Sequence, residues 1–190
     1  MLPIEHYIKI WYNEKNEFME NIADKMDKSK ICDKMRELQE KIDYQFNDEE
    51  LLALAMNSVK ISCKEGGKNH KEYANEGLAT VGDAVLKVVI ADHLYEQGVK
   101  TKGAITIKKS ELENNETFYN ITKEEGLMGY AYNEAYFQSD NPPQHKQVVH
   151  KAHDPYIEAI VGAIFKDCGF NGVKKWILTW LLPRLEKYKK

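Results

Sequence analysis

Two long segments of the chain carry apolar residues at helical spacing, and they constrain the fold more than any other feature of the sequence. The first covers residues 73–97, and Gly98 follows it in the position where glycine ends many helices. The second begins at Asp154-Pro155, with Asp as the N-cap and Pro at the first helical position, and ends at Gly169. The apolar stripes are Leu78, Val81, Val85 and Val89 in the first segment and Ile157, Ile160, Val161, Ile164 and Phe165 in the second.

The rest of the chain follows the same pattern in shorter pieces. We expect a helix through Met35 and Ile42, one from Glu49 to about Met56, one capped by Thr101, one ending at Gly126, and a last one through Trp176 and Trp180 with Pro183 near its end. Residues 60–71 are polar and contain Gly66-Gly67, so we expect a loop there. No alternating strand pattern competes with these helices, and the predicted fold class is all-α.

The composition fits a soluble globular domain. Of the 190 residues, 43% are apolar and 30% are charged, a balance that excludes a disordered chain. No apolar run reaches the roughly 18 residues of a membrane span, so we expect no membrane contact. Cys32, Cys63 and Cys168 are widely spaced and odd in number, which is typical of reduced thiols and predicts a cytoplasmic protein.

Basic residues gather in two places, although the formal net charge is −3. One cluster lies within residues 100–109, and the other occupies the C-terminus, residues 174–190. A local basic surface binds phosphate groups even when the whole protein is acidic. The alternative interpretation of both clusters is a solvated helix face without a ligand.

Carboxylates fall on matching faces of the two long predicted helices. Glu76 and Asp83 lie two turns apart on one face, and Asp154 and Glu158 are i,i+4 neighbours. Small residues permit a close helix crossing that brings Asp83 near Glu158, and these are Gly82, Ala84, Gly162 and Ala163. Clustered carboxylates favour a hard dication such as Mg²⁺, which activates water and polarises a phosphodiester. The alternative is a set of ordinary surface acids, with Asp154 acting only as a helix cap.

Four blocks of the sequence resemble the ribonuclease III family and occur in that family's order. The block NEGLATVGDAVL at 75–86 resembles the family's signature helix, and EAIVGAIFKDCG at 158–169 resembles its EALIGAIYLDxG helix. The block LLALAMNS at 51–58 resembles the early helix, and KSELENNETF at 109–118 resembles the SxLVNxxTL segment. The resemblance covers about residues 38–180.

This resemblance implies an all-helical endonuclease domain over residues 38–190, with residues 1–37 as an extra N-terminal helical segment. It also implies a homodimer that cuts double-stranded or structured RNA, with carboxylates holding Mg²⁺, or Mn²⁺ in its place. Asp83 matches the signature-helix aspartate, Glu158 matches the metal-binding glutamate of the second helix, and Glu76 matches an acid that supports the site. We expect no double-stranded-RNA-binding domain, a layout similar to that of the Mini-ribonuclease III members.

Two positions depart from the family pattern. Ala79 stands where the family places a metal-binding glutamate, and Pro155 stands where it places an aspartate. We therefore expect nearby acids to replace the missing ones, and the expected catalytic and metal-binding set is Glu158, Asp83, Asp154 and Glu76. The expected RNA phosphate contacts are Lys102, Lys108, Lys109 and Lys151.

Two other functions compete with an active nuclease. The first is a catalytically impaired dimer that binds or scaffolds structured RNA, which Ala79 and Pro155 favour. The second is a helical interaction module without an RNA role. A metal site or an HD-type phosphohydrolase is a further interpretation of the histidines before Asp154, but their spacing is also typical of loop and cap residues. These histidines are His145, His150 and His153.

Overall fold

The computed structural model describes residues 28–189 except residues 59, 66–67 and 132–154, so most of the predicted N-terminal segment lies outside it. The chain divides into two units, Met1–Lys34 and Met35–Lys190, and the second unit carries the fold that positions the site. The elements are α2 (Lys28–Lys41), α3 (Glu49–Ala55), β1 (Lys60–Glu65), β2 (Lys68–Tyr73), α4 (Glu76–Glu96), α5 (Lys102–Leu112), α6 (Asn115–Glu124), η1 (Leu127–Tyr130), α8 (Tyr156–Trp176), η2 (Ile177–Leu181) and α9 (Leu182–Tyr188). The all-α prediction is confirmed. None of the helices in the described ranges combines the length and the apolar run that a membrane crossing requires.

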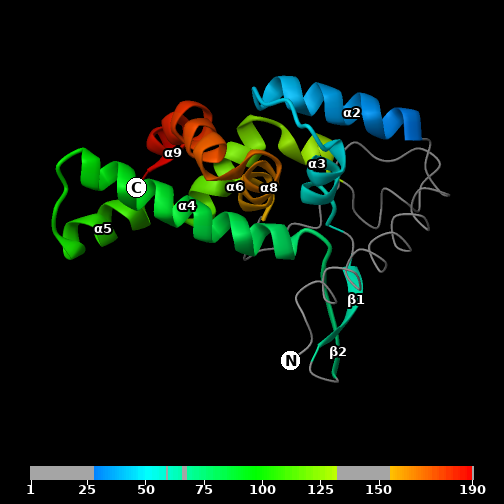
Figure 1. The fold of residues 1–190 in the computed structure, drawn as a ribbon, viewed down its shortest axis with the longest axis horizontal. Helices are drawn as coiled ribbons and strands as arrows, with labels where there is room; N and C mark the ends of the chain where they lie inside the picture. Colours follow the sequence, from blue (N-terminus) through cyan, green and yellow to red (C-terminus); the bar gives the residue numbers. More distant parts are fainter. Residues whose placement is uncertain (1–27, 59, 66–67, 132–154, 190) are drawn as a thin grey trace. The chain divides into compact units, whose positions relative to one another are not determined.

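Helices α4 and α8 form the centre of the second unit and cross at two glycines (Figure 1). A Cβ atom added to Gly82 would lie 1.8 Å from the carbonyl oxygen of Glu158. One added to Gly162 would lie 2.1 Å from the carbonyl oxygen of Leu78. Both distances are far below van der Waals contact, so only glycine permits this approach of the two backbones. The close crossing expected from the small residues is therefore confirmed.

The first half of α8 is buried on every side. All residues from Tyr156 to Ile164 are buried, and Ile157 and Ile160 have no exposed surface. A helix that is apolar around most of its circumference is typical of a position inside the core. Burial of each large aliphatic side chain contributes about 1.5–3 kcal/mol to folding. Glu158 is the charged residue of this stretch, and it is only 5% exposed.

Local signals in the sequence set several helix boundaries. The Thr101 hydroxyl accepts a hydrogen bond from the N–H of Ala104 at 3.3 Å and caps α5 as predicted. Gly98 follows α4 with a φ of 90°, which is the left-handed conformation that glycine favours at helix ends. Gly169 has a φ of 74° and interrupts α8 where the sequence predicts a helix end. Helical structure continues after Gly169 through η2 and into α9. Pro183 therefore lies in the first turn of α9 and not near the end of the last helix, where the sequence predicted it.

The expected loop at residues 60–71 is wrong. This segment belongs to an antiparallel hairpin of β1 and β2, in which Lys60 lies opposite Tyr73. The sequence Gly66-Gly67 is a strong hairpin signal. Both flanking segments are largely polar, however, so they lack the apolar alternation by which strands are predicted. Because Tyr73 ends β2, α4 begins at Glu76 and is shorter than predicted.

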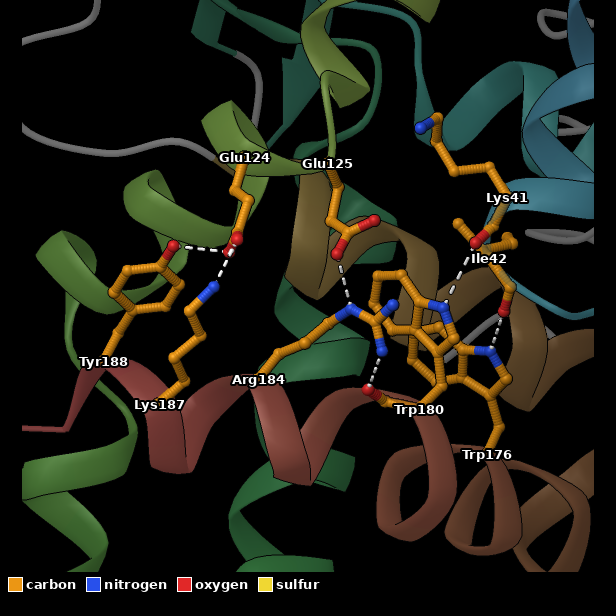
Figure 2. Close-up of polar contacts among 9 residues, drawn as sticks. All are labelled: Lys41, Ile42, Glu124, Glu125, Trp176, Trp180, Arg184, Lys187 and Tyr188. Atoms are coloured by element: carbon orange, nitrogen blue, oxygen red, sulfur yellow. Dashed lines mark hydrogen bonds and ion pairs between the residues drawn. The ribbon is translucent and has the colours of Figure 1, made fainter.

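Two tryptophans join the C-terminal helices to the end of α2. The rings of Trp176 and Trp180 stack with 4.9 Å between their centroids. The Nε1 atom of Trp176 donates to the carbonyl oxygen of Ile42 at 2.7 Å, and that of Trp180 donates to Lys41 at 3.2 Å (Figure 2). Both rings are buried and their N–H groups are used, so they serve the core and leave no stacking surface for nucleic-acid bases.

Basic residues near the C-terminus form ion pairs inside the unit. Arg184 lies over the ring of Trp180, 3.9 Å from its centroid, and donates to Glu125, as Figure 2 shows. The pairs are Arg184–Glu125 at 2.7 Å, Lys174–Asp92 at 2.6 Å and Lys187–Glu124. Several charges of the C-terminal cluster are therefore already neutralised by acids of the same chain.

Candidate carboxylate site

Asp83 lies in α4 directly after the glycine of the helix crossing. Its side chain is 38% exposed, and its Oδ2 atom accepts a hydrogen bond from Nζ of Lys87 at 2.6 Å. This hydrogen bond raises the pKa of Lys87 above its usual value, and the charges of Glu113 and Glu158 raise it further. Lys87 therefore lies within electrostatic reach of carboxylates from three parts of the fold.

Glu158 approaches the same place from the first turn of α8. Its carbonyl oxygen lies against Gly82, so Glu158 and Asp83 come from facing turns of the two crossing helices. A buried carboxylate is costly unless positive charge or hydrogen bonds compensate it. The charge of Lys87 provides part of that compensation, because Lys87 and Glu158 influence each other electrostatically.

Of the other predicted ligands, Glu76 is the one that lies within the described residues. Glu76 is half-buried in the first turn of α4, about 10 Å from Asp83 along the helix axis. Asp154 lies outside the described residues. Ala79 is 4% exposed and Pro155 precedes the first turn of α8, so neither position supplies a metal ligand. His145, His150, His153 and Lys151 also lie outside the described residues.

Glu113 is a member of the neighbourhood that the sequence did not identify. It follows α5 directly, its side chain is 5% exposed, and one carboxylate oxygen accepts a hydrogen bond from Nζ of Lys109 at 2.7 Å. Burial raises its pKa, Lys109 and Lys87 lower it, and the charge of Asp83 raises it. A signal was present in the sequence, because Glu113 stands at an apolar position of the SxLVNxxTL pattern.

The lysines predicted to bind phosphate differ in their surroundings. Lys102 and Lys108 are exposed on α5, next to the exposed side chain of Ile107. Lys109 is only 25% exposed at its side chain and is held by Glu113. The surface of α5 therefore offers Lys102 and Lys108 more openly than Lys109.

Carboxylate oxygens fit a hydrated divalent cation. Mg²⁺ in proteins is usually bound by one or two carboxylates together with waters and substrate phosphates. Asp83 and Glu158 come from facing turns of the two crossing helices, and one oxygen of Glu113 is buried without a hydrogen-bond partner. In the part of the chain that the structure describes, no group of three or more His, Cys, Asp or Glu residues is placed to hold a metal ion. Lys87 and Lys109 occupy two of the carboxylates in this arrangement.

Comparisons with known proteins identify ribonucleases among the relatives of this chain. The chain is 27% identical over 157 residues to ribonuclease 3 of Coxiella burnetii, covering 82% of this chain and 62% of that protein. It is 29% identical over 156 residues to ribonuclease 3 of Vibrio vulnificus, covering 82% and 64%. It is 30% identical over 153 residues to ribonuclease 3 of Aliivibrio fischeri, covering 80% and 63%. The chain thus spans less than two thirds of the length of these relatives.

A solved structure gives the same result at the level of the fold. The nuclease domain of ribonuclease III from Campylobacter jejuni superposes with a TM-score of 0.57 at 25% identity, covering 80% of this chain and 95% of that domain. A second structure of that domain gives a TM-score of 0.55 over 82% of this chain and 93% of the domain. The ribonuclease-III-like family model matches residues 48–185, which is well over half of the sequence. The chain therefore belongs to the ribonuclease-III-like family.

Proposed function

We propose that the chain is a Mg²⁺-dependent endoribonuclease that cleaves double-stranded or structured RNA as a homodimer. The observation that carries this proposal is the glycine crossing, which sets Asp83 and the buried Glu158 on facing turns of α4 and α8. The relatives named above are ribonucleases, and the Campylobacter domain is described as having a region involved in dimer formation. The expected compartment is the cytoplasm, because widely spaced cysteines are typical of reduced thiols.

In this proposal the protein supplies a small set of fixed oxygens. Glu158 and Asp83 hold the cation directly, and Asp154 adds a further carboxylate. Glu76 lies two turns from Asp83 on α4 and contributes through a bridging water. The bound Mg²⁺ supplies an activated water and a counter-charge for the phosphodiester. Without a cation, the ammonium group of Lys87 neutralises Asp83. With a cation bound to Asp83, the ammonium group of Lys87 would be free to pair with an RNA phosphate. Burial of Glu158 strengthens its attraction to the cation, because the surrounding protein screens charge less than water does.

RNA binding in this proposal depends on phosphates and shape. The exposed residues Lys102 and Lys108 contact the backbone of the duplex, together with Lys109 and Lys151. We expect Lys109 to contribute least among the described lysines, because Glu113 already neutralises it. An A-form duplex offers phosphates and 2′-hydroxyl groups to such a surface and little access to base edges, so we expect weak sequence preference.

Cleavage of one labelled RNA duplex of about 25 base pairs tests the proposal. We expect Glu158→Gln, which keeps the shape of the side chain and removes its charge, to lower the rate by orders of magnitude in Mg²⁺ and in Mn²⁺. Glu186→Gln changes an exposed acid of α9 and serves as the control, with unchanged cleavage. Cleavage that survives Glu158→Gln would refute the assignment of this site.

A catalytically impaired RNA-binding dimer is the second candidate function. The ion pair between Lys87 and Asp83 favours it, because an ammonium group already occupies one expected metal ligand. The absence of a carboxylate at Ala79 favours it as well. This candidate predicts duplex binding without cleavage in either metal, and no effect of Glu158→Gln on the duplex. A helical interaction module predicts no duplex binding at all.

A further inference from the structure

The two helices that carry Asp83 and Glu158 cross through glycines, and this contact alone does not fix how each helix is turned. Gly82 and Gly162 let the backbones approach closely, but they have no side chain that could interlock with the opposite helix. Apolar packing is not directional, whereas a hydrogen bond holds two atoms at a defined distance and angle. The orientation of α4 and α8 therefore depends on directional contacts elsewhere in the two helices.

Asn75 makes such a contact at the beginning of α4. Asparagine is a common N-cap, but the side chain of Asn75 makes no cap hydrogen bond. Its Nδ2 atom instead donates to the carbonyl oxygen of Ala55 at 3.1 Å, and neither residue has any exposed surface. The carbonyl oxygen of Asn75 also accepts a hydrogen bond from the N–H of Ala79 at 2.9 Å. Asn75 thus ties the first turn of α4 to the end of α3.

Tyr156 ties the first turn of α8 to the same segment. Pro155, at the N-terminus of α8, makes no side-chain cap hydrogen bond. The Tyr156 hydroxyl donates to Oγ of Ser58 at 2.8 Å, and Tyr156 is only 7% exposed. Ala55 is the last residue of α3, and Ser58 stands three residues after it. Residues 55–58 therefore contact the beginnings of both helices that carry the candidate carboxylates.

Tyr156 stands two residues before Glu158, in the first turn of α8. The first four N–H groups of a helix have no partner within the helix, so the first turn opens more easily than the rest. A side-chain anchor in this turn limits its rotation, and the direction of the Glu158 side chain follows the turn. We propose that Tyr156 is a positioning residue, whose hydrogen bond with Ser58 sets the direction of Glu158 relative to Asp83. The inference rests on the proposed function, because that function requires Glu158 to hold a cation.

A change in the direction of Glu158 affects cleavage more than RNA binding. Catalytic groups must be held within about 0.5 Å of their productive geometry, and a displacement of about 1 Å can cost about 100-fold in rate. Tyr156 is buried and carries no charge, whereas the proposed RNA contacts are lysines. Loss of the Tyr156 hydroxyl should therefore lower the rate of cleavage and leave the affinity for the duplex unchanged.

Two tyrosine-to-phenylalanine variants test this assignment, because each removes one hydroxyl that anchors α8. Tyr156→Phe removes the hydrogen bond beside Glu158. Tyr44→Phe is the matched control and removes the hydrogen bond to Asp167, about 13 Å further along the helix axis. We expect both variants to lower the Tm by about 2–4 °C, as loss of one hydrogen bond does in a chain of this size.

Only Tyr156→Phe should slow the chemical step. Its single-turnover cleavage rate on the labelled duplex in saturating Mg²⁺ should fall about tenfold or more. Its Kd for the duplex, measured by fluorescence anisotropy without metal, should stay within about twofold of the wild type. Tyr44→Phe should keep both values. A role confined to general stability predicts that both variants lose Tm and both keep the wild-type rate, and this result overturns the proposal.

Amide hydrogen exchange provides a readout that does not depend on cleavage. We expect residues 156–162 to exchange faster in Tyr156→Phe than in the wild type, because loss of the anchor favours local opening of the first turn. The same residues should exchange at the wild-type rate in Tyr44→Phe. Equal exchange of residues 156–162 in Tyr156→Phe and the wild type would show that the hydroxyl does not anchor the turn.

Ser58→Ala removes the acceptor and tests the hydrogen bond from its other side. The double variant Tyr156→Phe/Ser58→Ala should cleave at the rate of either single variant, because one hydrogen bond can be lost only once. Losses that multiply in the double variant would show that the two residues act independently, which also overturns the proposal. If Tyr156→Phe does not fold, Ser58→Ala takes its place in the comparison with Tyr44→Phe, since Ser58 is only half-buried.

Cleavage by the wild type separates this inference from the proposed function. If the wild type cleaves and Tyr156→Phe cleaves equally fast, only the assignment of Tyr156 fails. If the wild type is inert in Mg²⁺ and in Mn²⁺, the proposed function fails, and the inference fails with it. If Glu158→Gln abolishes cleavage and Tyr156→Phe slows it at an unchanged Kd, both proposals stand.

Discussion

Asp167 joins α8 to the segment that precedes α3 through four hydrogen bonds. Its Oδ2 atom accepts from the Tyr44 hydroxyl at 2.7 Å and from the backbone N–H and side-chain Nδ2 of Asn47, each at 3.1 Å. Its Oδ1 atom accepts from the N–H of Asp48 at 2.9 Å. Burial acts to raise the pKa of Asp167, but these hydrogen bonds outweigh it and hold the pKa below its ordinary value. The charged form of Asp167 therefore stabilises the folded state.

We expect this stabilisation to disappear in acid. The pKa of Asp167 is lower in the folded state than in the unfolded state. Its contribution to the free energy of unfolding is therefore complete above the pKa of an unfolded aspartate, about 3.9, and is lost as the pH falls through the pKa of the folded state. Asp167→Asn should lower the free energy of unfolding by about 1–3 kcal/mol at pH 7. The difference from wild type should narrow below about pH 4, as measured by urea unfolding. Exposed Glu186→Gln is the control, and a difference that stays constant with pH would contradict the argument.

At the scale of single residues, the sequence predicted the acids that helical spacing places on one face. It also predicted, from the small residues of the two helices, the crossing that sets Asp83 and Glu158 on facing turns. Periodicity and small residues are both local properties of the sequence. The ion pair of Lys87 with Asp83 could also have been predicted from the sequence, because the two residues are i,i+4 neighbours on one helix. For Glu113 the sequence held only its place at an apolar position of the SxLVNxxTL pattern, and the burial of its side chain became visible only in the structure.

At the scale of elements, the crossing of α4 and α8 makes a sharp prediction. A methyl group at Gly162 meets the carbonyl oxygen of Leu78, and the backbone cannot rotate away as a side chain can. Gly162→Ala should therefore cost at least about 1–3 kcal/mol in urea unfolding, as overpacked cores do. Gly77→Ala is the matched control in the same pair of helices. No atom lies within 4 Å of a Cβ there, so this substitution should be neutral or slightly stabilising. Equal stability of the two variants would refute the crossing.

The hairpin of β1 and β2 is the element that the sequence did not predict. Its strands pair along their whole length, with Lys60 opposite Tyr73 and Glu65 opposite Lys68. Strand prediction relies on apolar residues that alternate with polar ones. This segment has too few apolar residues to produce such an alternation. The backbone hydrogen bonds between β1 and β2 hold the hairpin together, and the amino-acid composition of the strands does not reveal this pairing. The long helices were predictable because their apolar residues recur at helical spacing, and many of these residues are buried.

At the scale of the whole molecule, charge pairing decides which lysines are open to RNA. The two basic clusters looked equivalent in the sequence, but ion pairs with distant acids engage much of the C-terminal one. Arg184 pairs with Glu125, and Lys187 pairs with Glu124. Glu124 is the last residue of α6 and Glu125 follows it directly, both far away in the sequence, so no local pattern predicts these pairs. Lys102 and Lys108 remain exposed on α5.

We therefore expect the two clusters to differ in RNA binding. Changing Lys102 and Lys108 together to Ala should weaken binding to every duplex by a similar factor. It should also reduce the slope of log affinity against log salt concentration by about one or two. Lys187→Ala is the control, and its effect should be small because Glu124 already neutralises this lysine. Fluorescence anisotropy across a salt series measures both quantities. An equal loss in the two variants would contradict the difference between the clusters.

The last prediction concerns self-association through α4. Val85 of α4 is only 9% exposed within one subunit, while Val88 of the same helix is 54% exposed. Val88→Glu should therefore convert a dimer into a monomer in sedimentation at about 10 μM, because a buried unpaired charge is costly at an interface. Ile107→Glu changes a residue of α5 that is 62% exposed, and this control should remain dimeric. A monomeric wild type, or equal dissociation of both variants, would show that α4 does not form the contact.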